Sequence, residues 1–134
     1  MIVAAVDPGL TTGLASYETA YDLVLGTKET TDPVEVGWYL DWLRDTAEAD
    51  GDDVVVVVEN YLGAGPRTAE ATHTLQVLGF VRWYAAMLGL PVVVQAPQQR
   101  LAYVTRATEL APKLRHAGAA LAHALAYAAK QKPY

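Results

Sequence analysis

The chain has 134 residues, 52% of them hydrophobic, so it can bury a compact core, and we expect a single domain over residues 1–134. It contains no cysteine, which excludes disulfides and thiolate zinc sites, and no apolar run predicts a signal peptide or a membrane span. The net charge of −5 hides an asymmetry, because residues 1–59 carry 2 basic and 13 acidic residues, whereas residues 60–134 carry 8 and 2. The second part therefore offers either a basic face for a polyanion or an ordinary solvated surface.

Apolar runs and turn residues predict elements in the order β-β-β-α-β-α-β-α. The run at 2–7 ends at a Pro-Gly turn and predicts a buried strand. Five consecutive valines at 54–58 do not alternate with polar residues, so they predict a strand that is covered on both faces. We therefore expect an α/β fold with a mixed five-stranded sheet and helices on both faces. The expected strands are 2–7, 13–18, 23–29, 54–58 and 91–95, and the expected helices are 33–48, 67–88 and 113–130, with a short helix within 96–110.

Two carboxylates stand at the ends of the most apolar strands, Asp7 after the first and Glu59 after the valine run. If these strands are parallel neighbours, they lie about 4.8 Å apart, and two like charges then meet at one edge of the sheet. A divalent cation such as Mg²⁺ or Mn²⁺ removes this conflict. The alternative is that Asp7 is only a turn residue and that Glu59 only marks where a strand reaches water.

Several motifs occur in order along nearly the whole chain: VDPGLTTG, VVVVVEN, ENYLGAGPRT, TLQVLGFVRWYA and RHAGAALAHALAY. This set resembles the RuvC-like branch of the ribonuclease H-like nuclease superfamily, and within it the small phage-type RuvC-like Holliday junction resolvases. The resemblance implies a homodimer, two Mg²⁺ or Mn²⁺ ions per active site, and hydrolysis of phosphodiesters in branched DNA. It also fits a cytoplasmic location, in a bacterial host cell if a phage encodes the protein.

The resemblance assigns catalytic positions one by one. Asp7 matches the aspartate that contacts both metals, Glu59 matches the glutamate of the fourth strand, and His116 matches a ligand on the last helix. An aspartate is expected three residues after His116, but Ala119 stands there and binds no metal. The chain is then an inactivated variant, another residue compensates, or the protein binds junctions without cutting them efficiently. A packed or surface role for His116 is the alternative to the ligand role.

Further residues are expected to contact DNA or a second subunit. His123 lies about two turns beyond His116, so we expect a structural or phosphate-proximal role for it. The helix at 67–88 carries more apolar residues than one stripe needs, which predicts a homodimer interface, with burial inside the monomer as the alternative. The expected DNA-binding residues are Arg67, Thr12, Gln98, Arg100, Lys113 and Arg115.

Three functions follow from these patterns. The first is a structure-specific endonuclease for Holliday junctions and other branched DNA, active or crippled at Ala119. The second is a non-cleaving protein that binds branched DNA. The third is a fragment of an actin-like kinase, since VDPGLTTG also resembles a phosphate loop, but that superfamily needs two such domains, and 134 residues are too few.

Overall fold

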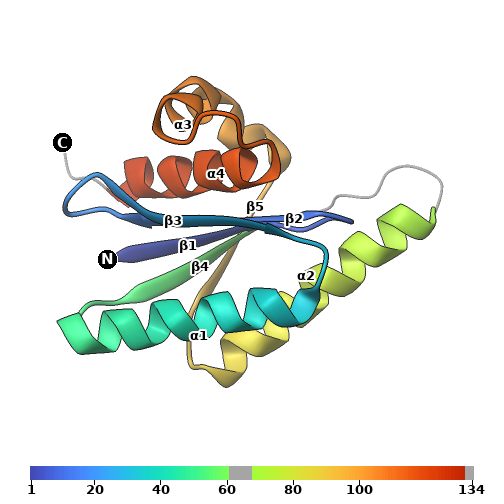
Figure 1. Cartoon of the computed structure of the whole chain (residues 1–134), viewed down its shortest axis with the longest axis horizontal. Coiled ribbons are helices and arrows are strands. Elements are labelled where there is room, and N and C mark those ends of the chain that lie inside the picture. Colours follow the sequence, from blue (N-terminus) through green and yellow to red (C-terminus); the bar gives the residue numbers. More distant parts are fainter. Residues whose placement is uncertain (61–67, 132–134) are drawn as a thin grey trace.

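The computed structural model describes residues 1–60 and 68–131, whose elements are arranged as in Figure 1. The described elements follow the predicted order, with two short helices before the last long one. The strands are β1 (Ile2–Asp7), β2 (Thr12–Glu18), β3 (Leu23–Thr30), β4 (Val54–Glu59) and β5 (Val92–Gln95). The helices are α1 (Pro33–Asp50), α2 (Ala69–Met87), the 3-10 helix η1 (Pro97–Tyr103), α3 (Val104–Leu110) and α4 (His116–Gln131).

The five strands form one mixed sheet in the order β3-β2-β1-β4-β5, which confirms the predicted fold class. β1 lies in the centre, antiparallel to β2 and parallel to β4, and β4 is parallel to β5. The valines of β4 are all buried, because helices cover both faces of the sheet at this strand. β1 and β4 therefore end at the same edge, which is where ligands commonly bind in open α/β sheets.

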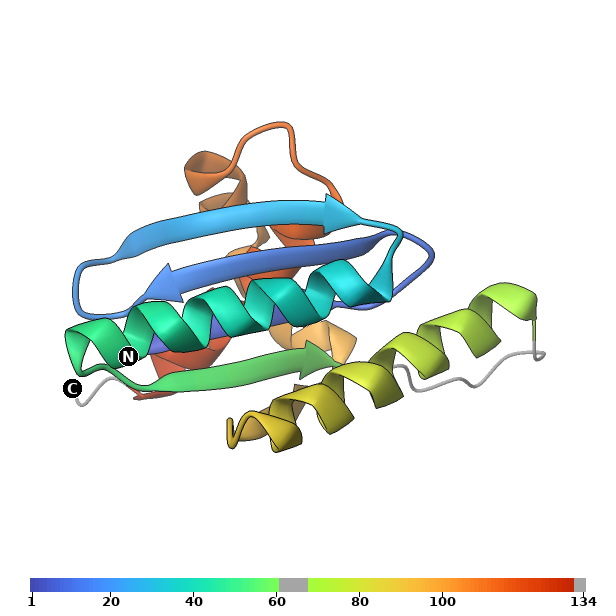
Figure 2. The same cartoon turned by 60° about the horizontal axis from the view of Figure 1, so that its bottom comes forward.

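Helices lie on both sides of the sheet, with α1 and α2 on one side and α3 and α4 on the other (Figures 1 and 2). Leu40 of α1 and Val81 of α2 pack against alternate residues of β1 and β4. Leu121 of α4 packs against the intervening residues of the same two strands. Within residues 1–60 and 68–131, no helix is long and apolar enough to cross a membrane.

The last long helix begins later than the sequence predicts, at His116 and not at residue 113. Lys113 has a φ of 68°, in the left-handed region, which a right-handed helix cannot include. The segment around Lys113 is therefore a turn, and it delivers Arg115 and His116 to the edge of the sheet where β1 ends.

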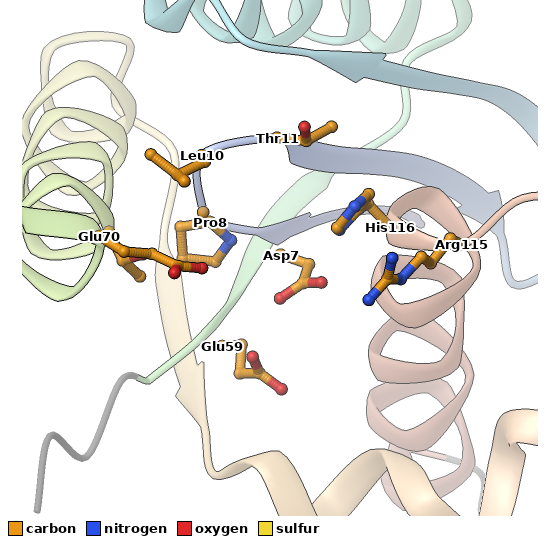
Figure 3. Close-up of a pocket in the computed structure, with 10 residues that line it drawn as sticks. Asp7, Pro8, Leu10, Thr11, Glu59, Glu70, Arg115 and His116 are labelled. Carbon is orange, nitrogen blue, oxygen red and sulfur yellow. The ribbon is translucent and has the colours of Figure 1, made fainter. Parts of the chain in front are cut away.

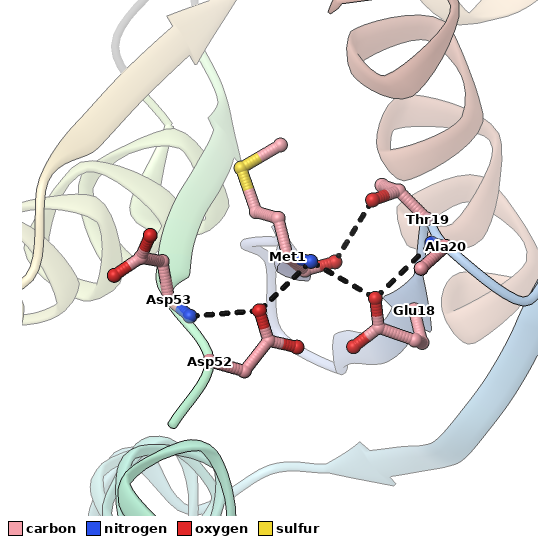
Figure 4. Close-up of polar contacts among 6 residues, drawn as sticks. All are labelled: Met1, Glu18, Thr19, Ala20, Asp52 and Asp53. Atoms are coloured by element: carbon pink, nitrogen blue, oxygen red, sulfur yellow. Dashed lines mark hydrogen bonds and ion pairs between the residues drawn. The ribbon is translucent and has the colours of Figure 1, made fainter. Parts of the chain in front are cut away.

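The other end of β1 is held by ion pairs at the N-terminus (Figure 4). The Met1 ammonium lies 2.9 Å from Glu18 Oε1 and 2.9 Å from Asp52 Oδ1. Glu18 ends β2 and Asp52 precedes β4, so these contacts join both neighbours of β1. Hydrogen bonding with Glu18 and with the ammonium lowers the pKa of Asp52 to about 2. The start of β1 is thus aligned between its neighbours, which helps to determine where Asp7 emerges at the far end.

Candidate active site

Asp7 and Glu59 emerge side by side at the carboxyl edge of the sheet. Val6 pairs with Val58 in the parallel ladder, so the next residue of each strand leaves the sheet at the same level. Figure 3 shows the two carboxyl groups directed into the same space. The predicted approach of the two carboxylates is therefore present in the structure.

Gly13 allows α4 to reach this edge. It is the register partner of Asp7 between β1 and β2, and a Cβ at this position would lie 2.0 Å from the His116 carbonyl oxygen and 2.6 Å from the Ala117 nitrogen. Because no side chain fits there, the first turn of α4 rests directly on β2, next to Asp7. The last glycine of VDPGLTTG thus serves helix docking, a role that the sequence pattern did not reveal.

A pocket of about 430 Å³ opens over the two carboxylates. The loop after β1 forms one wall, and Figure 3 shows His116, the first residue of α4, and Arg115, just before it, reaching toward Asp7. Glu70 lines the opposite side from α2. The pocket therefore presents three carboxylates, two of them side by side, beside a guanidinium and an imidazole. This combination can hold a cation against an anionic ligand.

The two carboxyl groups have opposite pKa shifts. Burial, and then hydrogen bonding with Glu59 and its negative charge, raise the pKa of Asp7 to about 7. Burial would also raise the pKa of Glu59, but hydrogen bonds with His123 and Asp7 outweigh it and lower that pKa to about 2. Near neutral pH, Glu59 is ionised and Asp7 is poised to gain or lose its proton, so a bound cation would favour the ionised form of Asp7.

Side chains from three other elements surround Glu59. Its Oε1 accepts hydrogen bonds from Arg100 Nε at 3.0 Å and from His123 Nε2 at 3.0 Å. His123 is fully buried on α4, and its Nδ1 lies 2.7 Å from Oε1 of Gln95, the register partner of Glu59 on β5. The position of His123 two turns along the helix predicted no contact with Glu59, and Gln95 was missed altogether. Only its place at the end of a strand could have indicated it.

The sequence matches no protein-family model and no curated protein, but the structure matches solved structures. One is T. thermophilus RuvC in complex with Holliday junction substrate, with 21% identity, a TM-score of 0.72, and coverage of 96% of this chain and 92% of that one. Another is the Fowlpox virus resolvase in complex with substrate Holliday junction DNA, with 16% identity, a TM-score of 0.57, and coverage of 97% and 98%. The fold is ribonuclease H-like. Its similarity to RuvC and to the poxvirus resolvase extends over nearly the whole chain.

The side chains at the carboxyl edge of the sheet supply some, but not all, of the ligands that a metal site usually has. Among the described residues, no three His, Cys, Asp or Glu side chains are placed to hold an ion together. His116 lines the same pocket as Asp7 and Glu59 without completing such a group. Two carboxylates can still hold a hard cation such as Mg²⁺ or Mn²⁺. Such an ion keeps several of its waters and is often bound by only one or two protein carboxylates. Asp7 and Glu59 therefore fit one ion.

The other candidate residues lie on α4, in the turn before it and on η1. His116 is half-buried, and Ala119 follows it on the same helix face without a donor atom. Lys113 and Arg115 are exposed, and neither forms an ion pair with a described residue. Gln98 is exposed on η1. Of the predicted DNA-binding residues, these last three have side chains that a ligand can reach.

Two other predicted DNA-binding residues, Thr12 and Arg100, form hydrogen bonds within the protein. Thr12 is only 3% exposed, and its hydroxyl donates to the Gly9 carbonyl oxygen at 3.4 Å, so its side chain shapes the turn after β1. Arg100 directs its Nε to Glu59. Arg67 lies outside the described residues.

Proposed function

We propose that this protein is a divalent-metal-dependent endonuclease for branched DNA such as the four-way Holliday junction. The observation that carries the proposal is the Asp7–Glu59 pair, which lines a pocket at the carboxyl edge of β1 and β4. The likeness of the fold to resolvases that are solved with Holliday junction DNA supports this choice of substrate.

The residues of the pocket suggest how the reaction would be divided among them. Asp7 and Glu59 would hold Mg²⁺ or Mn²⁺, which supplies Lewis-acid activation of the phosphodiester when bound. Arg115 and Lys113 would bind the DNA phosphates and contribute affinity that depends on salt. The His116 imidazole faces the same space and can accept a proton from an attacking water. Expected products are a 5′ phosphate and a 3′ hydroxyl.

A second candidate function is binding of branched DNA without efficient cleavage. Two observations favour it: Ala119 has no donor for a metal, and Arg100 neutralises part of the charge of Glu59 from 3.0 Å. Both features reduce the negative charge with which the pocket could attract cations.

A junction assay tests the proposal and separates the two candidates. We expect the purified protein to bind a synthetic four-way junction more tightly than a linear duplex of the same sequence, even in EDTA. With Mn²⁺ it should nick the junction, and Glu59→Gln should abolish nicking while binding in EDTA persists. Binding without any nicking favours the second candidate, and equal affinity for junction and duplex contradicts both.

The two basic residues in the turn before α4 give a further prediction. Replacing Lys113 and Arg115 together with alanine should weaken junction binding by roughly tenfold and lower the salt slope of binding by about 2. Arg106→Ala is the matched control, because Arg106 pairs with Asp22 and Glu109 and does not line the pocket. Unchanged affinity in the double variant would show that DNA binds elsewhere.

We also propose that the protein forms a homodimer through α2. Leu75, Gly79, Trp83 and Met87 follow one another at a spacing of four residues and are all exposed. Trp83 is 56% exposed and Met87 63%, although both are large apolar side chains. A Cβ on Gly79 would meet nothing within 4 Å, so a second helix can approach closely there. Such a ridge can pack against its own copy across a two-fold axis.

The dimer is tested by Trp83→Glu. This change should raise the dimer dissociation constant at least about tenfold, because a charge would be buried at the interface, and sedimentation velocity would show it as a lower mass. Trp38→Glu on α1 is the control, since Trp38 is also exposed (63%) but lies outside the α2 ridge. A monomeric parent protein at micromolar concentration would refute the proposed interface.

A further inference from the structure

One oxygen of Glu59 is already saturated by the protein. A carboxylate oxygen has two lone pairs, and Oε1 accepts one hydrogen bond from Arg100 and one from His123, both at 3.0 Å. His123 is fully buried, and its second ring nitrogen lies 2.7 Å from the buried Gln95, so the imidazole has no alternative partner in water. Glu59 therefore has only Oε2 left for a cation.

The last helix adds no anionic ligand to the site. His116 lines the pocket and Ala119 follows on the same helix face, but the alanine carries no donor atom. The next side chain on that face, His123, is already bonded to Glu59 and Gln95. Glu70 also lines the pocket, but among the described residues it completes no group of three metal-binding side chains with Asp7 and Glu59. The negatively charged donors that stand together are thus the Asp7 carboxylate and a single oxygen of Glu59.

Two guanidinium groups stand beside the two carboxylates. Arg100 lies 3.0 Å from Glu59, and Arg115 faces Asp7 from the turn before α4. Two divalent ions in one site stand only about 3.5–4 Å apart, and their repulsion must be offset by bridging and flanking carboxylates. Two carboxylates, one of them paired with a guanidinium, do not supply that charge.

We propose that this site takes one divalent cation, between Asp7 and Oε2 of Glu59, and that Arg100 and His123 fix the orientation of Glu59 for it. Arg100 then balances part of the charge of Glu59 without being one of the residues that line the pocket. This inference deepens the proposed function and rests on its metal dependence, but it concerns the number of ions and not the DNA that is recognised.

The number of bound ions can be measured without any reaction. Mn²⁺ titration of the purified protein, followed by electron paramagnetic resonance of the free ion, should give about one Mn²⁺ per chain. Ala119→Asp should raise this to about two, because a carboxylate is restored on the face of α4 that carries His116 and His123. His123→Ala should keep one site but weaken it by about 10- to 100-fold, as is typical for removal of an outer-shell partner.

Controls make the outcome decisive. Glu70→Gln alters the other acidic side chain that lines the pocket and should leave the number of ions unchanged. Two ions in the parent protein, none in the parent, or an Ala119→Asp variant that keeps its fold by circular dichroism yet still binds one, would each overturn the proposal. Two ions together with junction cleavage would refute the single-ion site and leave the proposed function intact. One bound ion without any preference for junctions over duplex would support the single-ion site and contradict the proposed function.

Discussion

Gly13→Ala is expected to detach the start of α4 from the sheet. The new Cβ would lie 2.0 Å from the His116 carbonyl oxygen and 2.1 Å from its carbon, and these are backbone atoms that cannot turn aside. We expect a loss of about 3 kcal/mol in the free energy of unfolding, at the upper end of the usual range for overpacking, and a fall in Tm of roughly 10 °C. Cleavage of junctions should be lost as well, because Arg115 and His116 would leave the pocket over Asp7.

Gly118→Ala provides the matched control on the same helix. A Cβ on Gly118 would meet nothing within 4 Å, and alanine favours a helix interior over glycine by about 1 kcal/mol. This variant should therefore be slightly more stable than the parent in thermal unfolding. If Gly13→Ala unfolds at the parent temperature and retains Mn²⁺ binding, the packing of α4 on β2 is not as the structure describes it.

Asp7→Asn is expected to stabilise the protein while abolishing the proposed cleavage of junctions. The pKa of Asp7 is raised from 3.8 to about 7, so the folded state holds a proton that the unfolded state releases. Through this group, stability is highest below pH 4, falls as the pH rises toward 7, and stays low above it. Asparagine removes this penalty, so we expect a gain on the order of 2 kcal/mol at pH 8 and almost none at pH 4.

The same variant should lose at least about tenfold in Mn²⁺ affinity and should not cleave junctions, because an amide replaces a charged ligand. Thermal unfolding at pH 4, 6 and 8, with and without Mn²⁺, measures both effects together. The exposed Asp50, substituted by asparagine, is the control and should show no comparable pH-dependent gain. A stabilisation equal at all three pH values would mean that Asp7 does not titrate under the influence of Glu59.

The local patterns of the sequence were sufficient for the fold class and for the two carboxylates of the candidate site. Strands and helices differ in the spacing of their apolar residues, so the extent of most elements could be predicted within a few residues. The lack of alternation in the valines of β4 correctly indicated helices on both faces. Asp7 and Glu59 were identifiable because each follows directly on a buried strand.

The patterns failed where backbone conformation departs from the periodic elements. The start of α4 was predicted three residues early, since Lys113 gives no sign of its left-handed conformation. Gly13 was predicted only as the first residue of the second strand, although its role is set by a helix that begins about 100 residues later in the chain.

What the sequence by itself determined is the set of elements and the two carboxylates at their ends, because burial periodicity and turn chemistry act between near neighbours in the chain. Only the tertiary structure decided which side chains meet Glu59. Arg100 and His123 stand 41 and 64 residues from it, and they reach it because β5 pairs with β4 and α4 packs across the sheet. Such contacts depend on strand order and helix docking, which no local spacing encodes.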